Sequence, residues 1–141
     1  MTVRVTRVFE FEAPPERVWD FIADPGKRAD AISVVREYTV DGNHATWEID
    51  LQLPMIDRTA TVETEDVERD EPEYVKFVGR SRVMRVTGEH RIEATDAGCR
   101  LHNEFVVDGR LPGVERFFRS RLDDELDNLE AALRRDLELP A

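Results

Sequence analysis

The chain has 141 residues, enough for one domain built around one hydrophobic core, and we expect that domain to span residues 1–141. Its 31 acidic residues outnumber its 20 lysines and arginines, and the net charge of −11 argues against a nucleic-acid partner, because such partners require basic surfaces. No run approaches the ~20 apolar residues of a membrane-spanning helix, and the single cysteine cannot form an internal disulfide, so we expect a soluble cytoplasmic protein.

The first predicted elements are a strand and a short helix. Apolar and polar side chains alternate over residues 3–11, where only Arg7 breaks the apolar set, and this pattern predicts a β-strand. The segment PPERVWDFIADP, residues 14–25, is typical of a helix of two to three turns, because proline is tolerated in the first turn and Pro25 ends the helix. So short a helix must pack against other elements. The apolar side chains that it offers are Val18, Phe21, Ile22 and, beside them, Trp19. The polar link at 26–33 has room for a further helical turn.

Six further strands and one long helix follow. The strands are expected at residues 34–40, 45–53, 59–67, 74–81, 83–95 and 99–107. Their short links predict antiparallel hairpins. From residue 114 the apolar residues recur every three or four positions, which predicts an amphipathic helix of about six turns. We expect this helix to dock on the sheet, because a solvated helix would leave its apolar stripe exposed. The stripe comprises Val114, Phe118, Leu122, Leu126, Leu129, Leu133 and Leu137.

The last hairpin predicts which face of the sheet is enclosed. With residues 97–98 as a two-residue turn, charge-compatible pairs fall on one face and apolar pairs on the other. On the enclosed face, His90 is expected opposite Phe105 and diagonal to Asn103. A slip of one residue would mix the two sets, so one face should be wet and the other enclosed.

The hairpin around residues 42–43 predicts a second part of the enclosed face. The facing pairs expected there are Tyr38 with Trp47 and Arg36 with Ile49, followed by Leu51. The loop after the strand near Val62 does not fix its register, so the inward-facing set of that strand stays open.

The order of elements and the segment APPERVWDFIADPGK, residues 13–27, resemble the START-like or Bet v 1-like superfamily, also called SRPBCC, with its polyketide cyclase/dehydrase and CoxG-like members. The resemblance covers essentially the whole chain. It implies an α+β helix-grip fold, in which a curved seven-stranded antiparallel sheet wraps around the long C-terminal helix and one or two short helices follow the first strand. It also implies a cavity between sheet and helix. A helix is only ~10 Å wide, narrower than the inner face of such a sheet, which also favours a pocket.

The enclosed face and the start of the long helix supply the candidate ligand-binding residues. They are Arg36, Tyr38, Trp47, Ile49, Leu51, Phe77, Met84, His90, Asn103, Phe105, Phe117 and Phe118. The aromatic residues among them line a cavity or simply pack the core. His90 is the candidate for catalysis, as a donor or general base toward a ligand carbonyl or enol, and the alternative is a core histidine satisfied by Asn103 or a backbone carbonyl. Arg36 is expected to bind an anionic group or to reach solvent at the rim.

Three functions remain open at this point. The leading one is binding, with transport as an extension, of a small hydrophobic or amphipathic ligand. The alternatives are a polyketide cyclase/dehydrase-type enzyme acting on a carbonyl substrate and, by resemblance, a CoxG-like accessory protein of an oxidoreductase. We expect no metal and no cofactor, because His90 and His102 face opposite sides and the sequence has no glycine-rich phosphate loop or nucleophile elbow. The sequence leaves the ligand's identity and the oligomeric state open, with a homodimer as one option.

The charge balance also predicts a habitat. Lysine occurs only at positions 27 and 76, while acidic residues are dense along the chain. Such a surface is typical of proteins from salt-loving organisms, a halophilic archaeon in particular, where salt screens the self-repulsion.

Overall fold

The computed structural model describes residues 2–51, 59–111 and 113–140. Within these ranges the elements, in chain order, are β1 (Thr2–Phe11), α1 (Pro15–Ile22), α2 (Pro25–Ala31), β2 (Val35–Asp41), β3 (His44–Asp50), β4 (Thr59–Asp70), β5 (Tyr74–Arg80), β6 (Met84–Ala94), β7 (Cys99–Gly109) and α3 (Val114–Asp136). The predicted strands and the long helix are confirmed. Residues 52–53 of one predicted strand, and residues 1 and 141 of the expected domain, lie outside the described residues.

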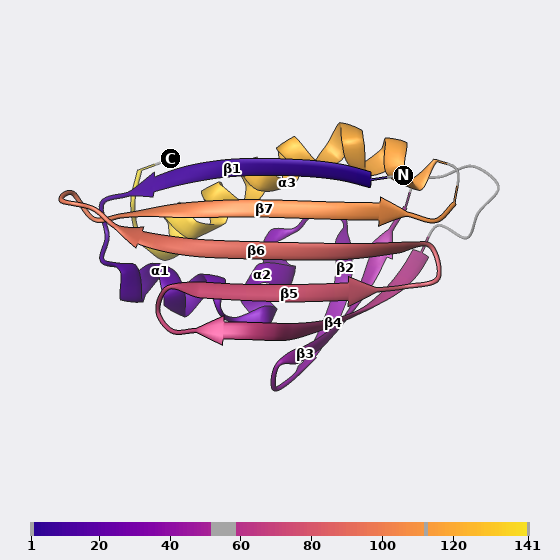
Figure 1. Ribbon diagram of the computed structural model, residues 1–141, viewed down its shortest axis with the longest axis horizontal. Coiled ribbons are helices and arrows are strands. Elements are labelled where there is room, and N and C mark those ends of the chain that lie inside the picture. Colours follow the sequence, from indigo (N-terminus) through magenta and orange to yellow (C-terminus); the bar gives the residue numbers. More distant parts are fainter. Residues whose placement is uncertain (1, 52–58, 112, 141) are drawn as a thin grey trace.

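The strands form one antiparallel sheet in the order β1-β7-β6-β5-β4-β3-β2. Figure 1 shows β2 and β3 crossing the direction of β1, β7, β6 and β5, with β4 bending between the two sets, so the sheet is strongly curved. The helix α3 runs along β1 and β7 (Figure 1), while α1 packs against β6 and α2 against β2. This is the helix-grip architecture expected from the sequence.

Proline begins each of the two short helices, and an aspartate caps the second. Pro15 occupies the first turn of α1, and Asp24 caps α2 by accepting hydrogen bonds from Gly26 N at 2.8 Å and Lys27 N at 3.3 Å. The further helical turn expected after Pro25 is therefore the helix α2. The predicted apolar side of α1 is confirmed, since Val18, Trp19, Phe21 and Ile22 are all buried.

The single charge in the apolar set of β1 attaches the sheet edge to α3. The guanidinium of Arg7 donates to Asp127 Oδ1 at 2.7 Å and to Asp123 Oδ1 at 3.0 Å. Both aspartates stand on the exposed side of α3, so the arginine reaches past the apolar seam to the solvent edge of the helix.

The β6–β7 hairpin has a different register from the predicted one. Ala94 pairs with Cys99, so the turn has four residues, 95–98, and His90 lies opposite Asn103 instead of Phe105. Thr95 closes this longer turn through hydrogen bonds with Gly98. The shift is two residues, which preserves the alternation, so the predicted enclosed face is still correct.

The β2–β3 hairpin follows the predicted register only near its turn. Tyr38 pairs with Trp47 as expected, but a bulge between Val35 and Glu37 places Val35 opposite Ile49. Arg36 is the extra residue of this bulge and is exposed, so its predicted position on the enclosed face is wrong. On β4 the structure assigns the inward set left open by the sequence, namely Ala60, Val62, Thr64 and Asp66.

Candidate ligand-binding site

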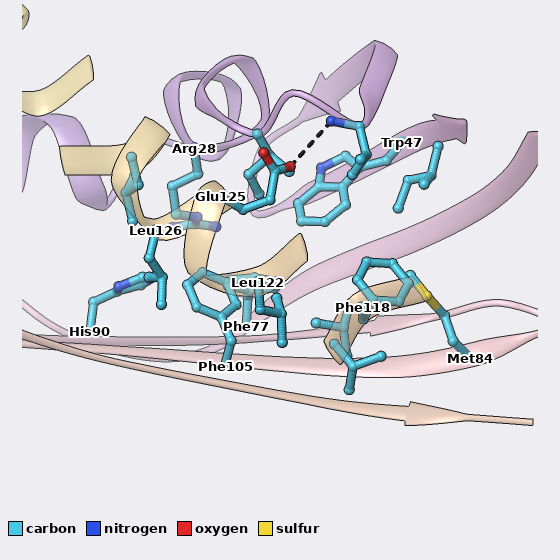
Figure 2. Close-up of a pocket in the computed structure, with 16 residues that line it drawn as sticks. Arg28, Trp47, Phe77, Met84, His90, Phe105, Phe118, Leu122, Glu125 and Leu126 are labelled. Carbon is cyan, nitrogen blue, oxygen red and sulfur yellow. Dashed lines mark hydrogen bonds between the residues drawn. The ribbon is translucent and has the colours of Figure 1, made fainter. Parts of the chain in front are cut away.

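A cavity of about 40 Å³ lies between the sheet and α3. Its lining is almost entirely apolar and comes from α2, the connection to β2, four strands and α3 (Figure 2). The lining residues are Arg28, Ile32, Val34, Trp47, Ile49, Phe77, Met84, Val86, His90, Phe105, Val107, Phe118, Leu122, Glu125, Leu126 and Leu129.

The cavity is small for a ligand site. A volume of about 40 Å³ accommodates a few water molecules, whereas typical small-molecule pockets measure roughly 300–1,000 Å³. The space expected between sheet and helix is therefore present but smaller than an organic molecule of ordinary size. An organic molecule of ordinary size requires the lining side chains or α3 to move outward.

Three buried nitrogen atoms around this cavity have no hydrogen-bond partner among the described residues. They are Arg28 Nε, Trp47 Nε1 and His90 Nε2. An unsatisfied buried polar group costs about 1–3 kcal/mol of stability, so such groups are rare in the cores of native proteins. Because all three belong to lining residues, they mark this cavity as a place for water or for the polar atoms of a ligand.

Arg28 reaches the cavity from α2 with most of its guanidinium already engaged. Its Nη1 donates to the carbonyl oxygen of Ile22 at 2.9 Å, and its Nη2 forms a buried ion pair with Asp66. Asp66 also accepts from Arg69 at 2.7 Å. Burial lowers the pKa of Arg28, and the neighbouring Asp66 opposes that shift. The guanidinium carbon lies 5.0 Å from the centre of the Phe77 ring. Nε is the guanidinium nitrogen that has no hydrogen-bond partner among the described residues.

His90 projects from the inner face of β6 with a defined tautomer. Its Nδ1 lies 2.7 Å from Asn103 Oδ1, while Asn103 Nδ2 donates to the carbonyl oxygens of Arg7 and Leu101. Since the amide nitrogen is turned toward those carbonyls, Oδ1 is the acceptor and Nδ1 carries the hydrogen. Burial, and next the charge of Arg28, lower the pKa of His90 to about 3. The ring is therefore neutral at pH 7, and its Nε2 is a bare acceptor.

Glu125 is a buried acid on the cavity-facing side of α3. Its carboxylate accepts hydrogen bonds from Ser33 N at 3.2 Å, Ser33 Oγ at 2.6 Å, Val34 N at 3.2 Å and Asn128 Nδ2 at 2.8 Å. Figure 2 shows one of these bonds as the dashed line at Glu125. These bonds hold the α2–β2 connection against α3 and complete the wall of the cavity.

The structure brings together a majority of the predicted site residues. Those that line the cavity are Trp47, Ile49, Phe77, Met84, His90, Phe105 and Phe118. Those that do not are Arg36, Tyr38, Leu51, Asn103 and Phe117. Tyr38 is 39% exposed and lies over Gly26 of α2. Asn103 does not line the cavity but forms a hydrogen bond with His90, which does. Whether the lining residues bind a ligand stays a prediction.

Sequence reasoning missed the two charged lining residues, Arg28 and Glu125. Arg28 lies in the segment interpreted as a polar link, and no local pattern distinguishes it from an exposed arginine. Glu125 had a usable signal, because it follows Leu122 by three positions and precedes Leu129 by four, which places it on the apolar stripe of the helix.

Within residues 2–51, 59–111 and 113–140, no group of three or more His, Cys, Asp or Glu side chains could hold a metal ion. Within the same ranges, no helix is long and apolar enough to cross a membrane. Burial raises the pKa of the Cys99 thiol, so this cysteine is not an activated nucleophile.

Comparisons with known proteins agree on one family and one fold. Residues 2–134 match the family described as polyketide cyclase/dehydrase and lipid transport. A START superfamily protein from Mycobacterium smegmatis is 12% identical with a TM-score of 0.75, covering 96% of this chain and 97% of its own. The ZhuI aromatase/cyclase from Streptomyces sp. R1128 is 14% identical with a TM-score of 0.75, covering 98% and 94%. Ara h 8.0201 is 12% identical with a TM-score of 0.68, covering 98% and 99%. No curated protein matches by sequence. At these identities the solved structures establish the fold alone.

Proposed function

Since the chain belongs to the polyketide cyclase/dehydrase and lipid transport family, within the START-like superfamily, we propose that it binds a small, largely apolar molecule between its sheet and α3. The proposal takes binding as the primary role and carriage of the bound molecule as its extension. It also places the protein in the cytoplasm, where a buried, unpaired Cys99 stays reduced.

One observation carries this proposal. The cavity is walled by apolar side chains, yet three of its lining residues keep a buried nitrogen without a hydrogen-bond partner among the described residues: Arg28 Nε, Trp47 Nε1 and His90 Nε2. A cavity that served packing alone would gain stability by pairing or replacing these groups. Retained polar atoms in an apolar pocket are the usual arrangement by which a site orients a ligand.

The enzymatic alternative also has a specific observation in its favour. His90 lines the cavity near the charge of Arg28, and its Nε2 is a buried acceptor without a partner among the described residues, as a proton acceptor for a carbonyl substrate would be. A general base works best with a pKa near the working pH, however, and a pKa of about 3 makes His90 a weak base at neutral pH. We therefore rank binding above catalysis.

A matched pair of variants tests the binding proposal. Val107 lines the cavity, whereas its neighbour Val106 lies on the outer face of β7, so the same substitution can fill or spare the site. We expect N-phenyl-1-naphthylamine, a neutral apolar dye, to bind the wild-type protein saturably with enhanced fluorescence. Val107→Phe should weaken this binding at least tenfold, corresponding to about 1.4 kcal/mol, and Val106→Phe should leave it unchanged. Equal binding by both variants, or no saturable binding by the wild-type protein, would contradict the proposal.

A further inference from the structure

Resting on the proposed function, we propose that the cavity selects molecules with a hydroxyl group at one end of an apolar skeleton and an accepting oxygen, such as a carbonyl, toward the other. The inference concerns the chemical class of the ligand, which the family match and the shared fold do not supply. It comes from the kinds of unpartnered atoms in the cavity and from where they lie.

The hydroxyl end is set by Arg28 and His90, which lie together at one end of the cavity in Figure 2. Arg28 Nε–H is a donor, and His90 Nε2 is an acceptor because its Nδ1–H is engaged by Asn103. A neutral hydroxyl can accept from the first and donate to the second, so a single group has the hydrogen-bonding character that both atoms lack.

Other end groups satisfy this pair less well. A ketone oxygen cannot donate to His90, so one buried acceptor would stay unpaired. A carboxylate would set its lone pairs against that of His90 Nε2, and the charge of Arg28 is already balanced by Asp66. An ammonium group would be repelled by Arg28.

The accepting oxygen is set by Trp47, which Figure 2 places away from His90 and close to Glu125. An indole Nε1–H is a donor only, so its partner must be an acceptor. The nearby carboxylate of Glu125 is occupied by Ser33, Val34 and Asn128. A carbonyl or ether oxygen of the ligand is the group that fits this donor.

The space between the two ends favours a flat apolar skeleton. The Phe77 ring lies between the polar groups, stacked with His90 at a centroid distance of 6.3 Å and edge-on to Trp47 at 5.7 Å. Phe105 adds a second ring, 6.1 Å from Phe77. Aromatic walls of this kind suit an aromatic ligand.

Four probes of similar shape separate the two polar requirements. They are 4-hydroxyacetophenone with both groups, acetophenone with the carbonyl alone, 4-ethylphenol with the hydroxyl alone, and ethylbenzene with neither. We expect calorimetric titration of the wild-type protein to give the tightest binding for the first and the weakest for the last, with about a tenfold gain for each polar group.

Two variants test which protein side chain produces each gain in affinity. His90→Phe should abolish the advantage of the hydroxyl and keep that of the carbonyl, and Trp47→Phe should do the reverse. Trp19→Phe, a buried tryptophan of α1 outside the cavity, is the control and should change neither. His90→Phe leaves Asn103 Oδ1 without its donor, so circular dichroism checks the fold of each variant, and the wild-type series tests the proposal by itself.

The outcomes distinguish the two proposals. Equal affinity of the wild-type protein for all four probes would overturn the inference about ligand class and leave the proposed binding function standing. It would mean that water alone satisfies Arg28, Trp47 and His90. Absence of binding by every probe, ethylbenzene included, would overturn both.

Discussion

At the scale of single residues, His90 gives the site a hydrogen-bond acceptor and makes the stability of the fold depend on pH. Burial and the charge of Arg28 lower its pKa from 6.5 to about 3. Between these two values the unfolded chain binds a proton at this position that the folded chain does not. His90 therefore contributes stability above pH 6.5 that is lost as the pH falls, at up to about 1.4 kcal/mol per pH unit.

This account predicts that the ring of His90 does not titrate in the folded protein between pH 8 and pH 4. The measurement is the NMR chemical shift of its ring Cε1 across that range. A transition with a midpoint near pH 6.5 would show that the imidazole is hydrated and would remove the argument for a neutral acceptor in the cavity.

Asp66 is the residue whose loss should cost the fold most directly. It neutralises the buried guanidinium of Arg28 and also accepts from Arg69. We expect Asp66→Asn to lower the free energy of unfolding by about 3–5 kcal/mol, because an unpaired charge would stay buried. Asp70→Asn, at an exposed position of the same strand, is the control and should cost less than about 0.5 kcal/mol in denaturant unfolding. Similar losses from both variants would refute this role for Asp66.

At the scale of elements, Glu125 connects α3 to the segment between α2 and β2. We expect Glu125→Ala to release the backbone amides of Ser33 and Val34, which would then exchange hydrogen faster, and to cost about 1–3 kcal/mol of stability. Asp124→Ala, an exposed neighbour on the same helix, should alter neither quantity. Unchanged exchange at Ser33 and Val34 in Glu125→Ala would exclude Glu125 as the attachment point.

The elements show what the sequence could and could not predict. Alternation and three-to-four spacing are local patterns, and they located the strands and α3. Register depends on turn geometry, so the four-residue turn at 95–98 and the bulge at Arg36 changed the expected pairs. Arg28 became visible only with its distant partner Asp66, whereas the place of Glu125 on the apolar stripe of α3 was a local signal that could have been used.

At the scale of the whole molecule, the net charge of −11 opposes the compact state. Salt shortens the screening length from about 10 Å at 0.1 M to about 3 Å at 1 M, so we expect the free energy of unfolding to rise between 0.1 M and 2 M KCl. Sucrose, which favours burial without screening charge, is the control and should give a smaller gain. A flat or falling response to KCl would contradict the prediction of a salt-adapted protein.

The whole fold presents a curved sheet covered by one long helix, with a cavity of about 40 Å³ between them. The central claim is that this space admits an apolar molecule when α3 or the lining side chains move outward. A crystal structure of the protein with N-phenyl-1-naphthylamine tests that claim most directly. The account predicts electron density for the dye between Phe77, Trp47 and Leu126, in an enlarged cavity. Density for the dye only on the outer face of the sheet, with the cavity not enlarged, would contradict it.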